Sequence, residues 1–339
     1  MSFFAASRLT AKSQIGIDEP ASFRLLQPKS LEEAARMLEE HGAAAVALAG
    51  GCDVLEKIKT QWIRPGFVVN LKPVLAKDVA AEKIGAGATV AQVAKSELLP
   101  AALRQAAVRV ATPQIRNMGT LGGNILQDSR CPYYRGPWHC YRAGGLTCDA
   151  VRGYTHEHAL FGGERCFTVT PSDTAVALVA LAAEAEIFSL REGGVRRVPL
   201  SDIFALPSYD ITRMHKLKQD ELLTSVLLPA KKPGARSSFR KAAMREAWDF
   251  ALASVAVECV MEGEVCRDVR VVLGAVAPVP WRATRAEEAL RGGKLRDRIE
   301  DAVRASVEGA EALPHNHYKI GLIKNLVREC LEEVAQAKA

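Results

Sequence analysis

Two glycine-rich stretches of this sequence have residue types suited to binding an anion. One spans positions 46–53 and contains two adjacent glycines. The other spans positions 111–124, contains three glycines and is expected to be a turn-rich run. Glycine has no Cβ, so a backbone N–H beside it can approach a phosphate oxygen closely. Two such stretches in one domain could together hold the two phosphates of a dinucleotide.

Half of the eight cysteines follow the second glycine stretch, within a segment that we call the cysteine segment, residues 128–168. They are Cys131, Cys140, Cys148 and Cys166. The segment has few apolar residues and no apolar periodicity, so it offers no core in which these thiols could simply pack. A long segment without regular structure inside a domain is usually functional or disordered, and the aromatic residues here argue against disorder.

Three interpretations of these cysteines are open. The thiols could be small buried hydrophobic groups. They could hold a structural zinc ion together with His139, His156 or His158. They could also bind an iron–sulfur cluster, whose thiolate ligands can be widely spaced. Zinc sites usually contain C-x-x-C pairs, which this segment lacks, so the cluster is favoured. A nucleotide site leading into such a cluster suggests electron transfer.

The rest of the sequence shows no arrangement typical of nucleophilic catalysis. There is no Ser-His-Asp or Cys-His pattern, and we therefore expect no catalytic residue of that kind. Cys259, Cys266 and Cys330 lie within strand or helix patterns and are expected to pack in a core.

The composition is that of an ordinary globular protein, long enough at 339 residues for two or three domains. No run of eighteen apolar residues exists, so no membrane span is expected. The net charge is +6, but the basic residues are scattered, which disfavours nucleic-acid binding. Positions 1–20 lack the apolar core and cleavage site of a signal peptide, and a cytoplasmic location is expected.

The elements that must position the glycine stretches alternate between strands and helices. Ser30 should cap the first helix, with Glu33 completing a capping box, and Pro113 should end the last one. Because no G-x-G-x-x-G follows the first strand, a Rossmann fold is disfavoured. The expected elements are a strand at 23–28, a helix at 31–41, a strand at 43–48, a helix at 54–60, strands at 67–71 and 84–88, and helices at 90–96 and 98–111.

Regular patterns resume after the cysteine segment. A helix and then a strand are expected over 173–188, a hairpin at Gly193-Gly194 and a strand at 221–229. Positions 231–234 form the best candidate linker. We therefore predict a domain over 1–229, containing the cysteine segment, and a C-terminal α+β domain over 230–339. Its expected strands are 239–245, 251–261 and 269–276, and its expected helices are 283–291, 296–313 and 317–335.

Several short motifs recur in the order typical of one family, and they cover nearly the whole chain. They are Ala49–Asp53, Thr112–Asn117, Thr120–Asn124, Ser172-Asp173, Glu221–Leu223 with Leu228-Pro229, Lys241 with Arg245 and Asp249–Ala251, and Leu273–Pro278 with Pro280 and Arg282. In this combination the chain resembles the FAD-binding (medium) flavoprotein subunit of the molybdenum hydroxylases, the group that includes xanthine dehydrogenase and carbon monoxide dehydrogenase.

The cysteine segment narrows this resemblance. Most flavoprotein subunits of the group pass directly from the Gly-Gly-Asn loop to the Ser-Asp pair, whereas this chain is similar to the beta subunit of 4-hydroxybenzoyl-CoA reductase, which has a [4Fe–4S] insertion there. The resemblance implies a [4Fe–4S] cluster on the four cysteines of the segment, with Cys166 or a nearby histidine as the fourth ligand. Cys52 stands where the family usually has threonine or another hydrogen-bonding residue.

The resemblance also implies an α+β fold and an FAD site. The FAD-binding domain would be of the vanillyl-alcohol-oxidase (PCMH) type with two lobes, followed by an α+β domain of the carbon monoxide dehydrogenase flavoprotein type. Lys241 matches a lysine near the isoalloxazine ring. The residues implied to contact FAD are Val46, Ala47, Leu48, Ala49, Gly50, Gly51, Cys52, Asp53, Thr120, Leu121, Gly122, Gly123, Asn124, Asp173, Leu223 and Lys241.

The function implied is electron transfer within a heteromeric oxidoreductase, alongside a [2Fe–2S] small subunit and a molybdopterin-containing large subunit. The external carrier could be a ferredoxin-like protein, NAD or a quinone. Five arginines could form a basic rim that steers an acidic ferredoxin-like protein, or they could only solvate the segment. They are Arg130, Arg135, Arg142, Arg152 and Arg165. The alternative hypothesis is a zinc-stabilised nucleotide-binding or scaffold protein without redox turnover.

Overall fold

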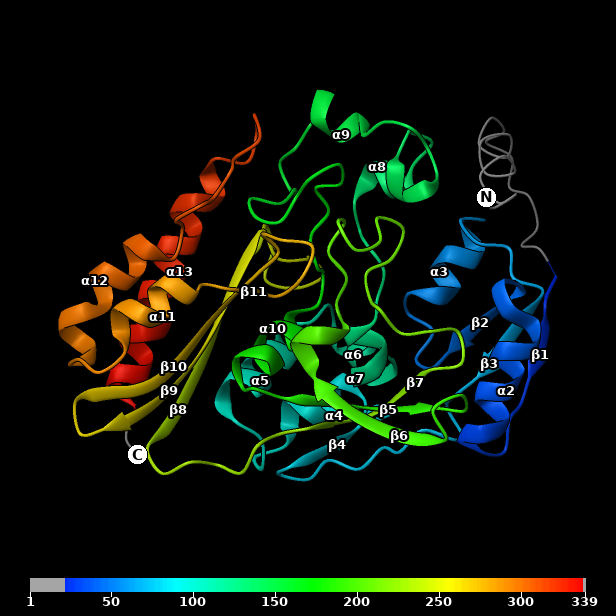
Figure 1. The fold of residues 1–339 in the computed structure, drawn as a ribbon, viewed down its shortest axis with the longest axis horizontal. Helices are drawn as coiled ribbons and strands as arrows, with labels where there is room; N and C mark the ends of the chain where they lie inside the picture. Colours follow the sequence, from blue (N-terminus) through cyan, green and yellow to red (C-terminus); the bar gives the residue numbers. More distant parts are fainter. Residues whose placement is uncertain (1–21, 338–339) are drawn as a thin grey trace.

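The structure, a computed structural model, describes residues 22–337 as three β-sheets with helices between and around them (Figure 1). This confirms the expected mixed α and β fold. The expectation that positions 1–20 are not a signal peptide concerns residues outside the described range. Between residues 22 and 337, no helix is both long and apolar enough to cross a membrane.

A small parallel sheet, with strand order β1-β3-β2, leads into the first glycine stretch. The Ser30 side chain accepts a hydrogen bond from the N–H of Glu33 at the start of α2, as expected. The capping box is incomplete, because the Glu33 carboxylate accepts from the N–H of Lys29 instead of that of Ser30. Strand β2 ends at Leu48, and the chain then turns through two glycines into α3. The elements are β1 (Arg24–Leu26), α2 (Leu31–His41), the 3₁₀ turn η2 (Gly42–Ala44), β2 (Ala45–Leu48), α3 (Val54–Lys59) and β3 (Phe67–Asn70).

A second, antiparallel sheet has strand order β4-β7-β5-β6 and carries the next group of helices. Thr89 and Gln92 form a capping box at the start of α4. Helix α10 is buried along its whole length. The elements are β4 (Lys83–Gly85), α4 (Val90–Lys95), α5 (Ala101–Val108), α6 (Pro113–Met118), α7 (Leu121–Ile125), α10 (Asp173–Ala180), β5 (Glu184–Ser189), β6 (Gly194–Pro199), the 3₁₀ turn η4 (Leu200–Ile203) and β7 (Leu222–Leu227).

The second glycine stretch is helical, so the expectation of a turn-rich run is wrong. Pro113 begins α6 rather than only ending the preceding helix, because the first position of a helix needs no N–H donor. The Thr112 hydroxyl caps α6 by accepting from the N–H of Ile115. Thr120 caps α7 in the same way, by accepting from the N–H of Gly123 at 3.1 Å.

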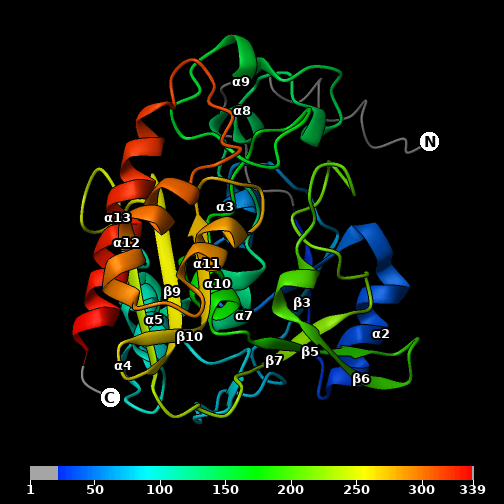
Figure 2. The ribbon, with the colours of Figure 1, turned by 60° about the vertical axis from the view of Figure 1, so that its left-hand side comes forward.

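The C-terminal part is an antiparallel sheet, β11-β10-β9-β8, with α11, α12 and α13 on one face (Figure 2). Its other face joins the core around α10, where Phe239, Ala256 and Val272 are buried. The helix expected over 296–313 is shorter than predicted, and strand β8 begins earlier. The elements are β8 (Ala235–Ala242), β9 (Ala253–Glu262), β10 (Val265–Gly274), β11 (Trp281–Arg282), α11 (Thr284–Leu290), α12 (Leu295–Ala305) and α13 (Tyr318–Gln336).

The cysteine segment projects from one end of the molecule, at the top of Figure 1. It contains single helical turns rather than only irregular chain: α8 (Pro132–Arg135), η3 (Tyr141–Ala143) and α9 (Asp149–Arg152). The residues that flank the segment lie together, because the hydroxyls of Ser172 and Thr174 donate to Asn124 Oδ1 at 2.8 and 2.6 Å. The segment is therefore an excursion that leaves and returns at almost one point.

Candidate functional site

A cavity of about 720 Å³ lies where the two glycine stretches meet α10, β7 and the C-terminal sheet. This volume is within the usual range for ligand sites. Of the residues predicted to contact FAD, only Leu48 and Leu121 do not line it, and Leu121 is wholly buried in the core. The predicted residues that line the cavity are Val46, Ala47, Ala49, Gly50, Gly51, Cys52, Asp53, Thr120, Gly122, Gly123, Asn124, Asp173, Leu223 and Lys241.

The first glycine stretch presents free backbone donors to this cavity. Among residues 22–337, the N–H groups of Gly50, Gly51, Cys52 and Asp53 have no hydrogen-bond acceptor. Gly51 adopts φ +79°, a conformation that side chains rarely tolerate. A Cβ on Gly50 would lie 2.3 Å from the carbonyl oxygen of Met118, so glycine there lets the two stretches touch. Four consecutive unpaired N–H groups are a suitable donor set for a pyrophosphate.

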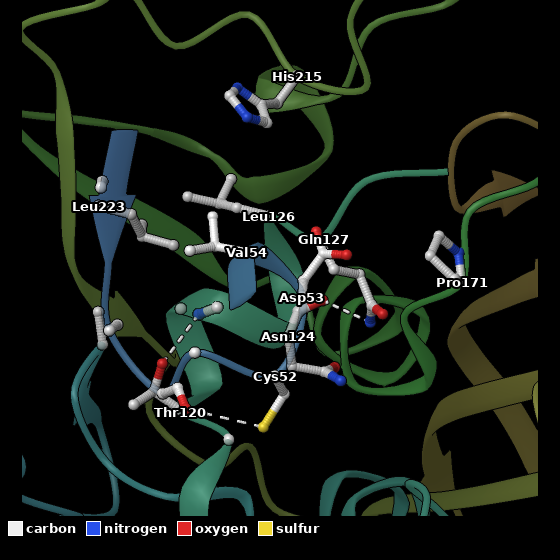
Figure 3. A pocket seen from close by; sticks show the side chains of 18 of the residues that line it. Cys52, Asp53, Val54, Thr120, Asn124, Leu126, Gln127, Pro171, His215 and Leu223 are labelled. Carbon is white, nitrogen blue, oxygen red and sulfur yellow. Dashed lines mark hydrogen bonds between the residues drawn. The ribbon is translucent and has the colours of Figure 1, made fainter. Parts of the chain in front are cut away.

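The second glycine stretch forms another wall of the cavity through α7. A Cβ on Gly122 would meet the Ala86 side chain at 2.9 Å, so this glycine serves close packing. Gly123 is exposed, and a Cβ there would meet only the Thr120 hydroxyl, at 2.9 Å. Figure 3 shows the hydrogen bond between Thr120 and the N–H of Gly123, with Cys52 nearby. The space beside Gly123 therefore belongs to the cavity.

A buried ion pair closes the side of the cavity next to the C-terminal sheet. Lys241 Nζ lies 2.7 Å from Asp173 Oδ2 and also donates to the carbonyls of Arg109 and Asp249. Burial raises the pKa of Asp173, and the positive charge of Lys241 opposes that rise. The pair joins α10 to β8, so it fixes the position of a cation at the cavity wall.

His215 is a cavity residue that the sequence analysis missed. Figure 3 shows it across the cavity from Thr120 and Cys52. Its Nδ1 is buried and has no hydrogen-bond partner among the described residues. Burial lowers the pKa of His215 to about 4, and the positive charge of Arg213 adds to the effect, so the ring is neutral near pH 7. No local motif marks this residue, because its surroundings come from distant parts of the chain.

The four cysteines of the cysteine segment lie near one another and next to backbone donors. Burial raises the pKa of Cys131 to about 12, and the neighbouring Cys140 and Cys166 contribute to that rise. Cys140 and Cys148 face each other across an isolated β-bridge. Burial also raises the pKa of Cys148 and Cys166, and backbone N–H groups oppose the rise at all three thiols: those of Tyr133 and Tyr134 at Cys131, those of Ala150 and Val151 at Cys148, and that of Thr168 at Cys166.

His158 Nε2 lies 3.3 Å from Cys131 Sγ. Burial lowers the pKa of His158 to about 4, so the ring is neutral near pH 7. His139 is exposed and pairs with Asp149, and the ring of His156 stacks on Tyr318. Across residues 22–337, no group of three or more His, Cys, Asp or Glu side chains is placed to hold a metal ion.

The basic rim expected from the sequence is only partly present. Arg130 pairs with Asp53 and Glu56, Arg135 pairs with Asp53, and Arg142 is buried beside Asp128. These three arginines face inward, where the carboxylates of Asp53, Glu56 and Asp128 neutralise their charge. Only Arg152 and Arg165 remain exposed.

Two family descriptions match this chain in succession. Residues 21–231 match the FAD binding domain in molybdopterin dehydrogenase, and residues 237–334 match the CO dehydrogenase flavoprotein C-terminal domain. The chain is 32% identical over 303 residues to the aldehyde oxidoreductase FAD-binding subunit PaoB of Escherichia coli K12, covering 86% of this chain and 92% of that protein.

Similarity extends to carbon monoxide dehydrogenases. The medium chain from Hydrogenophaga pseudoflava is 26% identical over 302 residues, covering 87% of this chain and 88% of that one. The crystal structure of a Cu,Mo-CO dehydrogenase in its cyanide-inactivated form superposes with a TM-score of 0.71 at 25% identity, covering 94% of this chain and 99% of that one.

Proposed function

Because this chain belongs to the family of FAD-binding medium subunits of molybdenum hydroxylases, we propose that it passes electrons between FAD and an external carrier through a [4Fe–4S] cluster. The chain is thus an FAD-binding oxidoreductase subunit of a heteromeric complex. We assign to that complex a [2Fe–2S] small subunit and a molybdopterin-containing large subunit, at which the substrate reacts. The proposed cluster ligands are Cys131, Cys140, Cys148 and Cys166.

The cavity residues fit the polar groups of FAD. The unpaired N–H groups of Gly50–Asp53 and the space beside Gly123 suit the pyrophosphate. Lys241, held by Asp173, supplies a positive charge at the cavity wall nearest the C-terminal sheet. When bound, FAD exchanges electrons either in pairs or singly, so it can link a two-electron reaction to one-electron carriers. The chain itself binds and orients the flavin.

The observation that carries the cluster proposal is the closeness of the four thiols in one segment, where Cys140 and Cys148 face each other across a β-bridge. Backbone N–H groups lower the pKa of Cys131, Cys148 and Cys166 against the effect of burial. Hydrogen bonds to sulfur stabilise the thiolate form and tune the potential of an iron–sulfur cluster. Each of Cys131, Cys140 and Cys148 directly precedes a helical turn, which explains why donors lie next to the sulfur. A single zinc ion binds each sulfur at about 2.3 Å and needs its ligands close together. Four irons occupy more space.

Metal analysis of anaerobically purified complex tests this proposal. Replacing Cys140 with serine should remove about four irons per chain and leave the FAD content close to that of the wild type. Cys330→Ser is the matched control, because Cys330 is buried in the C-terminal core, and it should leave iron unchanged. Stoichiometric zinc in place of iron in the anaerobically purified wild-type complex would support the scaffold alternative instead.

The proposed external carrier is a one-electron protein of the ferredoxin type. A flavin that exchanged electrons only with NAD would need no further cluster. The cysteine segment is at the surface, where Leu146 is 86% exposed, and Arg152 and Arg165 supply positive charge there. Stopped-flow mixing with reduced ferredoxin should show flavin reduction that slows as salt rises. Rapid reduction by NADH without a response to ferredoxin would count against this carrier.

A further inference from the structure

Asp53 lines the cavity, and its carboxylate is held by residues of the cysteine segment. Arg135 Nη2 donates to Asp53 Oδ1 at 2.9 Å, and Arg130 Nη2 forms an ion pair with the same oxygen at 2.9 Å. Asp53 Oδ2 accepts from the backbone N–H of Asp128 at 3.0 Å. All three partners lie within residues 128–135 of the cysteine segment. An unpaired carboxylate beside the cavity would repel a phosphate, and the guanidinium groups of Arg130 and Arg135 offset that charge.

The contact continues along α3 as a connected set of charges. Lys57 Nζ lies 3.2 Å from Asp128 Oδ2, and Arg142 Nη2 lies 3.4 Å from Asp128 Oδ1. The hydroxyl of Tyr134 donates to Asp128 at 2.9 Å. Although burial opposes the effect, Lys57 and Arg142 hold the pKa of Asp128 well below its ordinary value.

These charged side chains are largely removed from solvent, with exposed fractions between 2% and 21%. Partly buried charge networks tolerate the loss of one partner poorly, because the remaining charges are left unpaired away from water. Removing the charge of Asp53 would leave Arg135 without its only carboxylate partner among residues 22–337. The position of the segment therefore depends on the conformation of the first glycine stretch.

We infer that Asp53 is a positioning residue that couples the two cofactor sites, so that FAD bound at the glycine stretch favours cluster binding in the cysteine segment and the cluster favours FAD. The part of this inference that concerns the cluster rests on the proposed function. FAD contacts would order residues 50–53, and that order sets the carboxylate against Arg130 and Arg135. Thermodynamic linkage requires the same effect in the opposite direction.

A double-mutant cycle on the purified complex tests this coupling. The affinity for FAD is measured by flavin fluorescence in the wild type, Asp53→Asn, Cys140→Ser and the double variant, and iron is counted in each. Each single change should weaken FAD binding about tenfold, and the double variant should be no weaker than either, because both remove the same coupling. Asp53→Asn should also lower iron content. Additive losses in the double variant, or unchanged FAD affinity in Asp53→Asn, would overturn the inference.

The matched control is Asp301→Asn, which alters an exposed ion pair with Arg304 on α12. It should leave FAD affinity and iron unchanged. If the wild type contains no cluster iron, the proposed function fails, and limited proteolysis of the segment then decides the role of Asp53. FAD should protect the segment from cleavage in the wild type and lose that effect in Asp53→Asn. Equal protection in both proteins would show that Asp53 does not connect the sites.

Discussion

At the scale of single residues, a substitution at Gly123 tests the position of the FAD cavity most directly. Its missing Cβ leaves space that faces the cavity, whereas a side chain on Gly50 would strike the carbonyl of Met118 and push the glycine stretches apart. We expect Gly123→Val to weaken FAD binding about tenfold or more with a normal circular dichroism spectrum, and Gly50→Val to lose flavin together with stability.

Gly321 of α13 provides the matched control for that prediction. Nothing lies within 4 Å of a Cβ built there, and φ is unremarkable. Gly321→Val should keep a full complement of FAD. Retention of full FAD content by Gly123→Val, measured from the visible spectrum after gel filtration, would mean that the pyrophosphate lies elsewhere.

His215 predicts an acid sensitivity of the folded state. Its pKa falls from 6.5 in an unfolded chain to about 4 in the fold. The contribution of neutral His215 to the free energy of unfolding is fully present above pH 6.5 and is lost as the pH falls toward 4. Over that range the unfolded chain binds a proton at this residue and the folded chain does not. The loss by pH 5 should be about 2 kcal/mol. Urea denaturation at pH 7.5 and at pH 5 gives the change in unfolding free energy between these two pH values. In His215→Gln that change should be smaller than in the wild type by about 2 kcal/mol. An unchanged difference would show that His215 is solvated.

At the scale of elements, predictions from the sequence succeeded where the signal was local. Ser30 and the apolar spacing after it defined α2, and Gly193-Gly194 defined the β5–β6 hairpin. The second glycine stretch was mispredicted because Pro113 can end one helix or begin the next, and here Thr112 caps α6 with Pro113 in its first turn. Asp53 and its partner Asp128 are 75 positions apart, so their contact could not be predicted from spacing.

Helix α13 and the turn before it hold the far side of the cysteine segment, beside it in Figure 2. The Asn316 amide donates to the carbonyls of His158 and Ala159 at 3.0 and 3.2 Å, and its oxygen accepts from Leu313. Asn316 is fully buried. Asn316→Ala should therefore cost about 1–3 kcal/mol by leaving these groups unsatisfied.

Thermal unfolding and iron content check the role of Asn316, with Asn325→Ala on an exposed face of α13 as the control. The Asn316 variant should unfold at a lower temperature and lose cluster iron more readily on dilution. Equal behaviour of the two variants would show that the segment does not depend on α13 for its position.

At the scale of the whole molecule, the cysteine segment is held from two sides. Asp53 and Lys57 hold the beginning of the segment against the first glycine stretch and α3. Asn316, in the turn before α13, holds the later part of the segment. If the segment is replaced by a short Gly-Ser link between Gln127 and Val169, the remaining chain should fold with lower stability, because Leu160 and Phe161 pack in the C-terminal core. It should also lose the iron of the proposed cluster and bind FAD about tenfold more weakly. Co-elution of flavin with the shortened chain in gel filtration tests this, and an insoluble product would show that the segment is part of the folding core.

The closeness of Asn124 and Ser172 has a consequence for how such a protein could arise. Because the segment leaves and re-enters the chain at hydrogen-bonded neighbours, a gene could gain or lose these residues without moving any strand of the flavin lobe. An ancestral flavoprotein would need only a few later substitutions, such as acquisition of the arginines opposite Asp53, to turn a tolerated loop into an additional redox module. Under the proposed cluster assignment, the number of electron carriers in such a chain would change by insertion of one segment, with the rest of the fold kept.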